Sequence, residues 1–214
     1  MAIPVLIIGE SGTGKTTSLR NFKKGEVSIV NVSKKPLPFK NDLTAIKTDN
    51  YAQIAGLLSR AIANSIVIDD AQYLMAFEYM ERAKEVGFTK FNDIGQKFFY
   101  LVKTAISLPD NKIIYFLMHI ERTDAGTEKA KTIGQIIDNK ITLEGLFAIV
   151  LKTVVQISGK GKREYFFSTE NNGADTVKSP MGMFEGSLID NDLKLVDDTI
   201  RRFYGLEIQG ETNA

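Results

Sequence analysis

The chain contains no cysteine among its 214 residues. This absence excludes disulfides, thiolate zinc sites and cysteine nucleophiles, and it suits a reducing compartment. Long apolar runs are also missing, since no stretch approaches the length needed to cross a bilayer. The apolar segment 3–8 has no basic region before it and runs directly into glycines, so we predict a strand there and not a signal peptide. We therefore expect a cytoplasmic protein without a membrane partner.

A large net charge is missing as well. Lys and Arg number 27, and Asp and Glu number 26, which gives a formal charge of +1. No overall positive field therefore indicates nucleic acid, and any basic surface must be local. The hydrophobic fraction of 43% is ordinary for a globular chain. Length and composition predict one domain, which we place at 1–205, followed by a disordered tail at 206–214.

Short apolar runs alternate with segments that have helical spacing. Strands are expected at 4–8, 27–32, 65–68, 112–118, 147–157 and 163–168. Helices are expected at 16–24, 51–64, 73–86, 92–106 and 190–204. This alternation predicts an α/β fold with a mostly parallel sheet flanked by helices.

One segment matches the phosphate-binding pattern G-x-x-x-x-G-K-[ST] without a mismatch. It consists of Gly9, Glu10, Ser11, Gly12, Thr13, Gly14, Lys15 and Thr16, with Thr17 directly after it. Glycines permit backbone angles that turn N–H groups toward phosphate oxygens. In such a P-loop, Lys15 reaches the β- and γ-phosphates and the Thr16 hydroxyl ligates Mg²⁺. The pattern predicts a P-loop nucleoside triphosphatase that binds ATP or GTP with Mg²⁺.

The alternative is a chance match in a glycine-rich turn. Average residue frequencies give such a match in about one chain in a hundred of this size. The context decides against it, because the motif lies between an apolar strand and a predicted helix, as phosphate binding requires.

Two adjacent carboxylates follow the third apolar run. Asp69 ends the strand Ile66-Val67-Ile68, and Asp70 comes next. In the Walker B arrangement, Asp69 accepts hydrogen bonds from Mg²⁺-bound water, and Asp70 polarises the attacking water. The alternative is an aspartate pair that caps the next helix.

His119 is the only histidine, and it follows the fourth apolar run. We interpret it as a γ-phosphate sensor, since the neighbouring strand of P-loop folds often ends in a polar residue. The alternative is a partly buried, hydrogen-bonded histidine. No second His or Cys is available to complete a zinc site.

The order of these motifs resembles the phage nucleotide-binding family of RecA-like ATPases, some of which are single-strand annealing proteins. The strand with its P-loop, the segment 66–70 and the segment Phe116-Leu117-Met118-His119-Ile120-Glu121 carry the likeness, which extends from residue 3 to about 204. The resemblance implies a RecA-like sheet, ATP as the nucleotide and a homo-oligomer, ring or filament, with ATP between subunits. It also implies action on single-stranded DNA in phage annealing, recombination or replication, in the cytoplasm of a bacterial host.

Two basic regions take their meaning from this resemblance. The segment 121–142 falls where the family carries a mobile DNA-contacting loop, and its basic residues are Arg122, Lys129, Lys131 and Lys140. Lys178 falls where a basic finger reaches the ATP of a neighbouring subunit. Solvated surface residues are the alternative in both cases, since acidic residues dilute the charge of the loop.

The chain departs from the family after the second strand. RecA-like recombinases place a catalytic glutamate there, whereas segment 30–36 contains no carboxylate. Water activation then falls to Asp70, Glu10 or Glu121, or turnover is slow. The pair Lys34-Lys35 in this stretch contacts nucleotide, DNA or a partner, or belongs to an exposed loop.

Three functions remain open at this stage. The first is a DNA-dependent ATPase, and the second is a P-loop kinase of a small molecule. The third is a helicase loader or nucleotide switch that acts through replication or recombination proteins, because one core serves switches and motors alike. A kinase lid usually contains clustered arginines, and Arg163 stands alone in the sequence.

Overall fold

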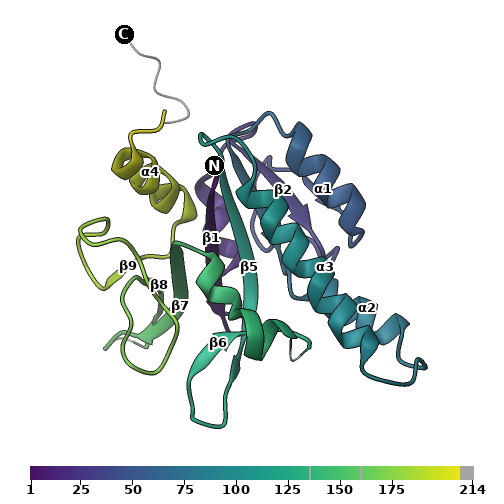
Figure 1. Ribbon diagram of the computed structural model, residues 1–214. Coiled ribbons are helices and arrows are strands. Elements are labelled where there is room, and N and C mark those ends of the chain that lie inside the picture. The colour runs from purple at the N-terminus through teal and green to yellow at the C-terminus, as the bar shows by residue number, and fades with distance from the viewer. Residues whose placement is uncertain (135, 160, 208–214) are drawn as a thin grey trace.

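The computed structural model describes residues 1–134, 136–159 and 161–207. Its strands are β1 (Ile3–Gly9), β2 (Val27–Asn31), β3 (Ala45–Lys47), β4 (Ser65–Asp69), β5 (Ile113–Arg122), β6 (Glu128–Ala130), β7 (Ile149–Ile157), β8 (Arg163–Ser168) and β9 (Leu188–Asp190). They lie in the order β3-β2-β4-β5-β1-β7-β8-β9, and β6 pairs with β5 (Figure 1). The strands from β3 to β7 in this order are parallel, and β8, β9 and β6 pair antiparallel.

Helices cover both faces of this sheet. The α-helices are α1 (Tyr51–Arg60), α2 (Tyr73–Glu81), α3 (Thr89–Ile106) and α4 (Leu193–Tyr204). Shorter turns of helix are η1 (Thr16–Asn21), η2 (Ile136–Ile141) and η3 (Leu143–Leu146). Figure 1 shows α1, α2 and α3 grouped on one side of β5 and α4 on the other. The predicted α/β fold with a mostly parallel, helix-flanked sheet is confirmed.

Each face of the sheet has its own apolar core. In β1, Leu6 and Ile8 join the core beneath α1, α2 and α3. Val5 and Ile7 point to the opposite core, which includes η1 and α4. Burial on both faces explains why β1 is a continuous apolar run and does not alternate with polar residues.

The strand order brings the predicted site residues to one edge of the sheet. β5 lies between β1 and β4, and its register places His119 opposite Gly9. β2 pairs with β4 so that Asn31 lies opposite Asp69. Because parallel strands point their carboxyl ends the same way, the P-loop, His119 and the two carboxylates meet above one edge.

The helix predicted at 16–24 is wrong in type and length. The structure has a 3₁₀ helix of six residues, η1, that ends at Asn21. Phe22 is extended and only 2% exposed, because it packs in the core beneath α4. Burial of this aromatic ring takes the chain out of the helix three residues earlier than the sequence pattern predicts.

The polar loop predicted at 121–142 is wrong for much of its length. β5 continues to Arg122 and forms a hairpin with β6, and the π-helix η2 follows at 136–141. The hairpin register places Glu121 opposite Lys129 and Arg122 opposite Glu128. Opposite charges on facing strands stabilise such a pair. Residue 135 of this segment lies outside the described residues.

The closing helix begins later than residue 190. Asp190 belongs to β9, and α4 begins at Leu193 after Asp192, whose carboxylate accepts hydrogen bonds from two backbone N–H groups of the first turn. β3 and β9 have three residues each, which is too short for a strand pattern to appear in the sequence. Residues 208–214 of the predicted tail lie outside the described residues.

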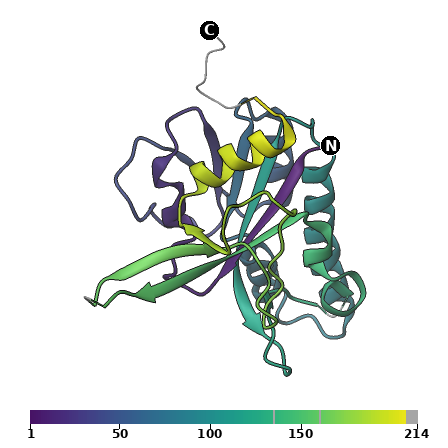
Figure 2. The same cartoon turned by 90° about the vertical axis from the view of Figure 1, so that its left-hand side faces the viewer.

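The outer parts of β7 and β8 form an arm that projects from the sheet (Figure 2). Their pairing runs from Lys152 opposite Ser168 to Ile157 opposite Arg163.

Among the described helices, none is long and apolar enough to cross a membrane.

Candidate nucleotide-binding site

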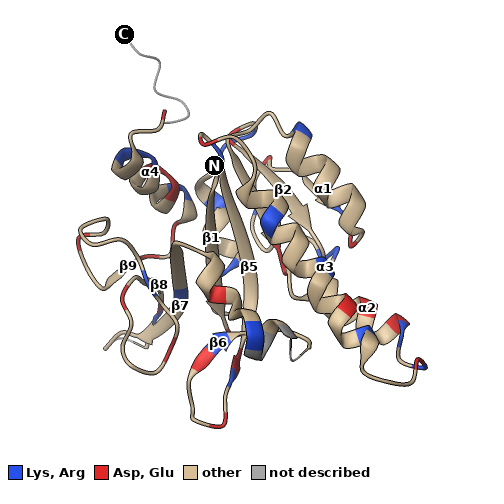
Figure 3. Cartoon of the chain, in the orientation of Figure 1, with Lys and Arg blue, Asp and Glu red and all other residues tan. Residues whose placement is uncertain are grey.

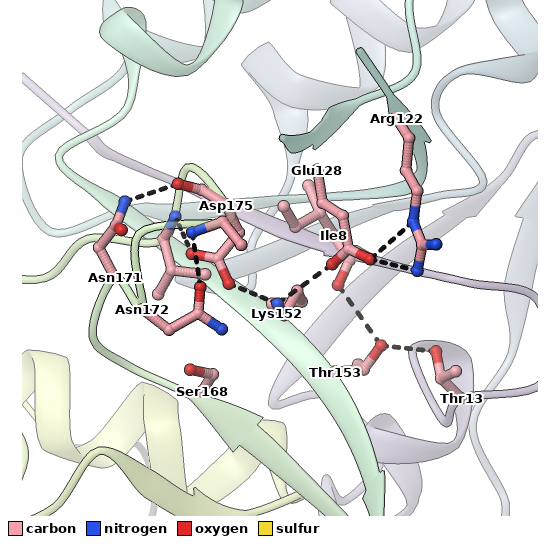
Figure 4. Close-up of polar contacts among 12 residues, drawn as sticks. Ile8, Thr13, Arg122, Glu128, Lys152, Thr153, Ser168, Asn171, Asn172 and Asp175 are labelled. Carbon is pink, nitrogen blue, oxygen red and sulfur yellow. Dashed lines mark hydrogen bonds and ion pairs between the residues drawn. The ribbon is translucent and has the colours of Figure 1, made fainter. Parts of the chain in front are cut away.

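The P-loop leaves β1 at Gly9 and turns sharply toward η1. Gly12 has φ 79° and Gly14 has φ 97°, a region of backbone angles that glycine adopts without steric cost. The side chain of Thr13 fixes the middle of the loop, since its Oγ1 donates to the Glu10 carbonyl at 2.8 Å. Thr13 Oγ1 also lies 2.5 Å from Thr153 Oγ1 on β7 (Figure 4). β7, the strand that pairs with β1, therefore supports the loop.

Lys15 lies inside the loop and is only 6% exposed. Its Nζ donates hydrogen bonds to the carbonyls of Gly9 and Glu10, both at 2.8 Å. Burial lowers the pKa of Lys15 to about 8, although the nearby carboxylates of Asp70 and Asp69 act in the opposite direction. The ammonium carries three donors, so it holds the loop and still has a donor for an anion.

Thr16 and Asp69 meet although 53 positions separate them in the chain. Thr16 Oγ1 donates to the two carboxylate oxygens of Asp69 at 2.9 and 3.0 Å. Asp69 is 2% exposed, and burial together with the Asp70 charge raises its pKa to about 7. A hydroxyl and a carboxylate are oxygen ligands of the kind that Mg²⁺ prefers.

This pair fits a magnesium ion that is shared with a nucleotide. Among the described residues, no group of three or more His, Cys, Asp or Glu side chains could hold a metal ion. Magnesium is usually bound through one or two carboxylates together with substrate phosphates, so a complete protein cage is not required. Thr16 and Asp69 are the residues that would hold it.

Asp70 and His119 form a second polar pair beside the first. His119 Nε2 lies 3.5 Å from Asp70 Oδ1, and the backbone N–H of His119 donates to Gln72 Oε1 at 3.2 Å. Burial acts to raise the pKa of Asp70, but the hydrogen bonds of His119 and Ser33 and the Lys35 charge outweigh it and lower the pKa to about 2. Asp70 has φ 59°, a strained angle for a residue with a side chain.

These groups open into one cavity of about 840 Å³. Of the predicted residues, it is lined by Ser11, Gly12, Gly14, Lys15, Thr16, Thr17, Asp69, Asp70 and His119. Glu10 and Thr13 line a different cavity, and Glu121 pairs with Lys129 at 3.0 Å. Asp70 is therefore the one of the three water-activation candidates that lines this cavity.

Several lining residues were not predicted from the sequence. Arg20 follows the P-loop, and Asn31 ends β2. Arg163 and Tyr165 come from β8, and Asn191 directly follows β9. Asn31 has a signal that could have found it, because it is a polar residue near the end of the apolar run predicted at 27–32. The arm residues have no such signal, since only tertiary folding places β8 beside the P-loop.

The predicted nucleic-acid residues divide into two groups. Arg122 lies 2.8 Å from Glu128, and Lys129 pairs with Glu121, so acidic partners neutralise both on the β5–β6 hairpin. Figure 3 shows both colours of charge on this hairpin. Lys131 and Lys140 are exposed. The structure brings none of the four into the cavity beside the P-loop.

Lys178 lies on the segment beside β7. Its backbone N–H and carbonyl pair with Val150 at 2.9 and 2.8 Å, and its side chain is exposed. It does not line the cavity of its own chain. Its predicted contact with the ATP of a second subunit stays a prediction.

An ion-pair network holds the neighbouring elements together (Figure 4). Lys152 on β7 pairs with Glu128 at 3.1 Å and with the buried Asp175, and Glu128 also binds Arg122. These pairs fix the β5–β6 hairpin and the segment near residue 175 against β7. Thr153, the next residue of β7, thereby has a firm position behind the P-loop.

Comparison with known proteins gives a distant likeness to ATPases. No protein-family model matches the chain, and no curated protein matches it. Among solved structures, 71 chains match. The X-ray structure of the Legionella pneumophila ATPase DotB is 12% identical with a TM-score of 0.39, and the match covers 97% of this chain and 53% of that one. The pilus retraction motor PilT with bound ADP is 12% identical with a TM-score of 0.39, covering 80% and 48%.

The chain thus spans about half the length of both structures. At this identity and TM-score, the likeness assigns no function. The fold is established by the strand order and register of this chain, and its function must be argued from the site.

Proposed function

We propose that this protein binds ATP with Mg²⁺ in the cavity beside the P-loop and hydrolyses it. One observation carries the proposal: Thr16 Oγ1 lies 2.9 Å from the carboxylate of Asp69, directly beside the buried Lys15. A phosphate cradle alone holds an anion. Its junction with a buried carboxylate on another strand adds the place for a cation that nucleoside triphosphate chemistry needs.

Each residue has a separate task in this proposal. The P-loop N–H groups and Lys15 bind the phosphates, and Lys15 does so with the donor that the Gly9 and Glu10 carbonyls leave free. Thr16 and Asp69 would hold a magnesium ion, which would supply positive charge next to the phosphates. Preorganised charges of this kind act without further rearrangement during the reaction.

In this proposal Asp70 orients the attacking water, and His119 contacts the terminal phosphate. The low pKa of Asp70 keeps its carboxylate ionised at neutral pH, so it accepts a hydrogen bond from water. Such a weak base orients the water and does not remove its proton early, which suits the loose transition state of phosphoryl transfer. His119, oriented by Asp70, then responds to the phosphate that leaves.

Isothermal titration calorimetry with ATP and Mg²⁺ tests this function. The wild type should bind ATP, and Lys15→Ala should lose most of that binding because it removes the buried cation. The matched control is Lys24→Ala, which removes an exposed lysine on the same segment. If the wild type releases no heat with either ATP or GTP, the proposal fails.

Single-stranded DNA as an activator remains a proposal that rests on the family resemblance. Two of the predicted contact residues already have acidic partners. ATP hydrolysis with and without single-stranded DNA, together with a gel shift of a labelled oligonucleotide, decides the matter. Equal rates and no shift would leave ATP hydrolysis driven by a protein partner as the next candidate.

A further inference from the structure

Two adjacent lysines diverge at the turn after β2. Lys34 has φ 61°, in the left-handed region, and its Nζ lies 2.7 Å from Asp49 Oδ2. Asn31 Nδ2 donates to the Lys35 carbonyl at 2.8 Å and fixes the backbone of the turn. Asn31 is itself only 2% exposed at the end of β2. This firm turn directs the two lysines to different places.

Lys35 reaches the cavity beside the P-loop. It lines the same cavity as Lys15 and Asp70. Its Nζ lies 3.7 Å from Asp70 Oδ2 and 5.4 Å from the centre of the Tyr73 ring. The Lys35 side chain is 65% exposed, so a contact at this length holds it only weakly. Lys35 is therefore free to change partners when an anion arrives.

We propose that Lys35 binds the terminal phosphate of the nucleotide and selects triphosphate over diphosphate. The inference deepens the proposed ATP-binding function and rests on it. A γ-phosphate near Thr16 and Asp69 also comes near the ionised Asp70, and like charges at short range repel. The Lys35 ammonium faces Asp70 and can neutralise the added charge by moving from the carboxylate to the phosphate.

The backbone supports a functional reading of this contact. Among the described residues, those with positive φ other than glycine are Lys34, Asp70 and Thr142. Two of these three belong to the Lys35–Asp70 contact: Asp70 is one of its partners, and Lys34 directly precedes the other. Such angles cost of order 1–3 kcal/mol and collect at ligand clamps and switch regions.

Binding of a non-hydrolysable ATP analogue and of ADP, each with Mg²⁺, tests the inference by calorimetry. Lys35→Gln removes the charge and keeps most of the length, and Lys35→Arg keeps the charge. Lys34→Gln is the matched control, because Lys34 pairs with Asp49. Lys35→Gln should lose about tenfold in affinity for the triphosphate analogue, as expected for one charge-assisted hydrogen bond. Its ADP affinity should stay unchanged.

Lys35→Arg should recover triphosphate binding, and Lys34→Gln should match the wild type for both nucleotides. The inference is overturned if Lys35→Gln leaves the ratio of triphosphate to diphosphate affinity at the wild-type value. If the Lys35–Asp70 pair were purely structural, its loss in Lys35→Gln would instead lower the unfolding temperature and weaken the binding of both nucleotides equally. If the wild type binds neither nucleotide, the proposed function itself fails, and the two failures are thereby distinct.

Discussion

A β-carbon on Gly9 would lie 1.8 Å from Oγ1 of Thr153 on the neighbouring strand. No real contact is this short, so glycine is required here by the packing of β7 against the P-loop. The first glycine of the motif therefore serves strand packing, whereas Gly12 and Gly14 serve the backbone angles of the loop.

Gly9→Ala should destabilise the protein by about 2 kcal/mol, because an added methyl overpacks a well-filled site. Removing the Thr153 hydroxyl in the double variant Gly9→Ala/Thr153→Ala should recover part of this loss, because the added β-carbon still lies 2.9 Å from Thr13 Oγ1 and 3.2 Å from the β-carbon of residue 153. Urea unfolding measures both. The matched control is Gly145→Ala, where an added β-carbon meets nothing within 4 Å and φ is not positive. Equal stability of Gly9→Ala and wild type would contradict the packing argument.

Asp69→Asn should make ATP binding insensitive to Mg²⁺. The amide keeps the size of the side chain but removes the negative charge that attracts the cation. Calorimetry in Mg²⁺ and in EDTA should differ clearly for the wild type and hardly at all for Asp69→Asn. Asp42→Asn, at an exposed aspartate, should behave as the wild type. A variant that still gains affinity from Mg²⁺ would remove Asp69 from the metal site.

Asp197→Ala should cost about 3–5 kcal/mol of stability, because it leaves a buried charge without its partner. Arg201 is fully buried, and its Nε donates to Asp197 at 2.7 Å. Asp198→Ala is the neighbouring control, because its pair with Lys194 is partly exposed and worth about 0.5 kcal/mol. Chemical denaturation measures both variants. Similar losses of stability in the two variants would show that the buried pair stabilises the protein no more than the partly exposed pair does.

Tyr115→Phe should change the stability of the protein at alkaline pH. Burial raises the pKa of Tyr115 well above its ordinary value, and the Asp197 carboxylate raises it further. The Tyr115 phenol stays neutral in the folded protein, whereas it ionises above pH 10 in the unfolded chain. The contribution of this phenol to the free energy of unfolding is therefore fully present below pH 10 and is lost progressively above it. The loss approaches about 1.4 kcal/mol per pH unit for one tyrosine.

Urea unfolding between pH 8 and pH 11 measures this slope. Tyr115→Phe should be less stable than the wild type by about 1 kcal/mol at pH 8, since Asp197 loses a donor at 2.9 Å. Its stability should then fall less steeply above pH 10. Tyr100→Phe, at a tyrosine that is 55% exposed, should keep the wild-type slope. Parallel curves for Tyr115→Phe and wild type would refute the assignment.

The sequence by itself determined the P-loop, the cradle that we propose for phosphate, because its chemistry is local. Consecutive residues supply the glycine angles, the ammonium and the hydroxyl, and an apolar run before them marks the buried strand. The Asp69 strand and the fourth strand could be predicted for the same reason, since strands buried on both faces leave continuous apolar runs. The α/β class followed from the alternation of these runs with helical spacing.

Only the tertiary structure decided which distant groups join that cradle. The pairing of Gly9 with His119 depends on β5 lying between β1 and β4, and strand order leaves no local mark in a sequence. The support by Thr153 and the cavity wall from Tyr165 depend in the same way on where β7 and β8 pack. Lys34 and Lys35 look alike in the sequence, and the fixed turn after Asn31 alone gives one to Asp49 and the other to the cavity.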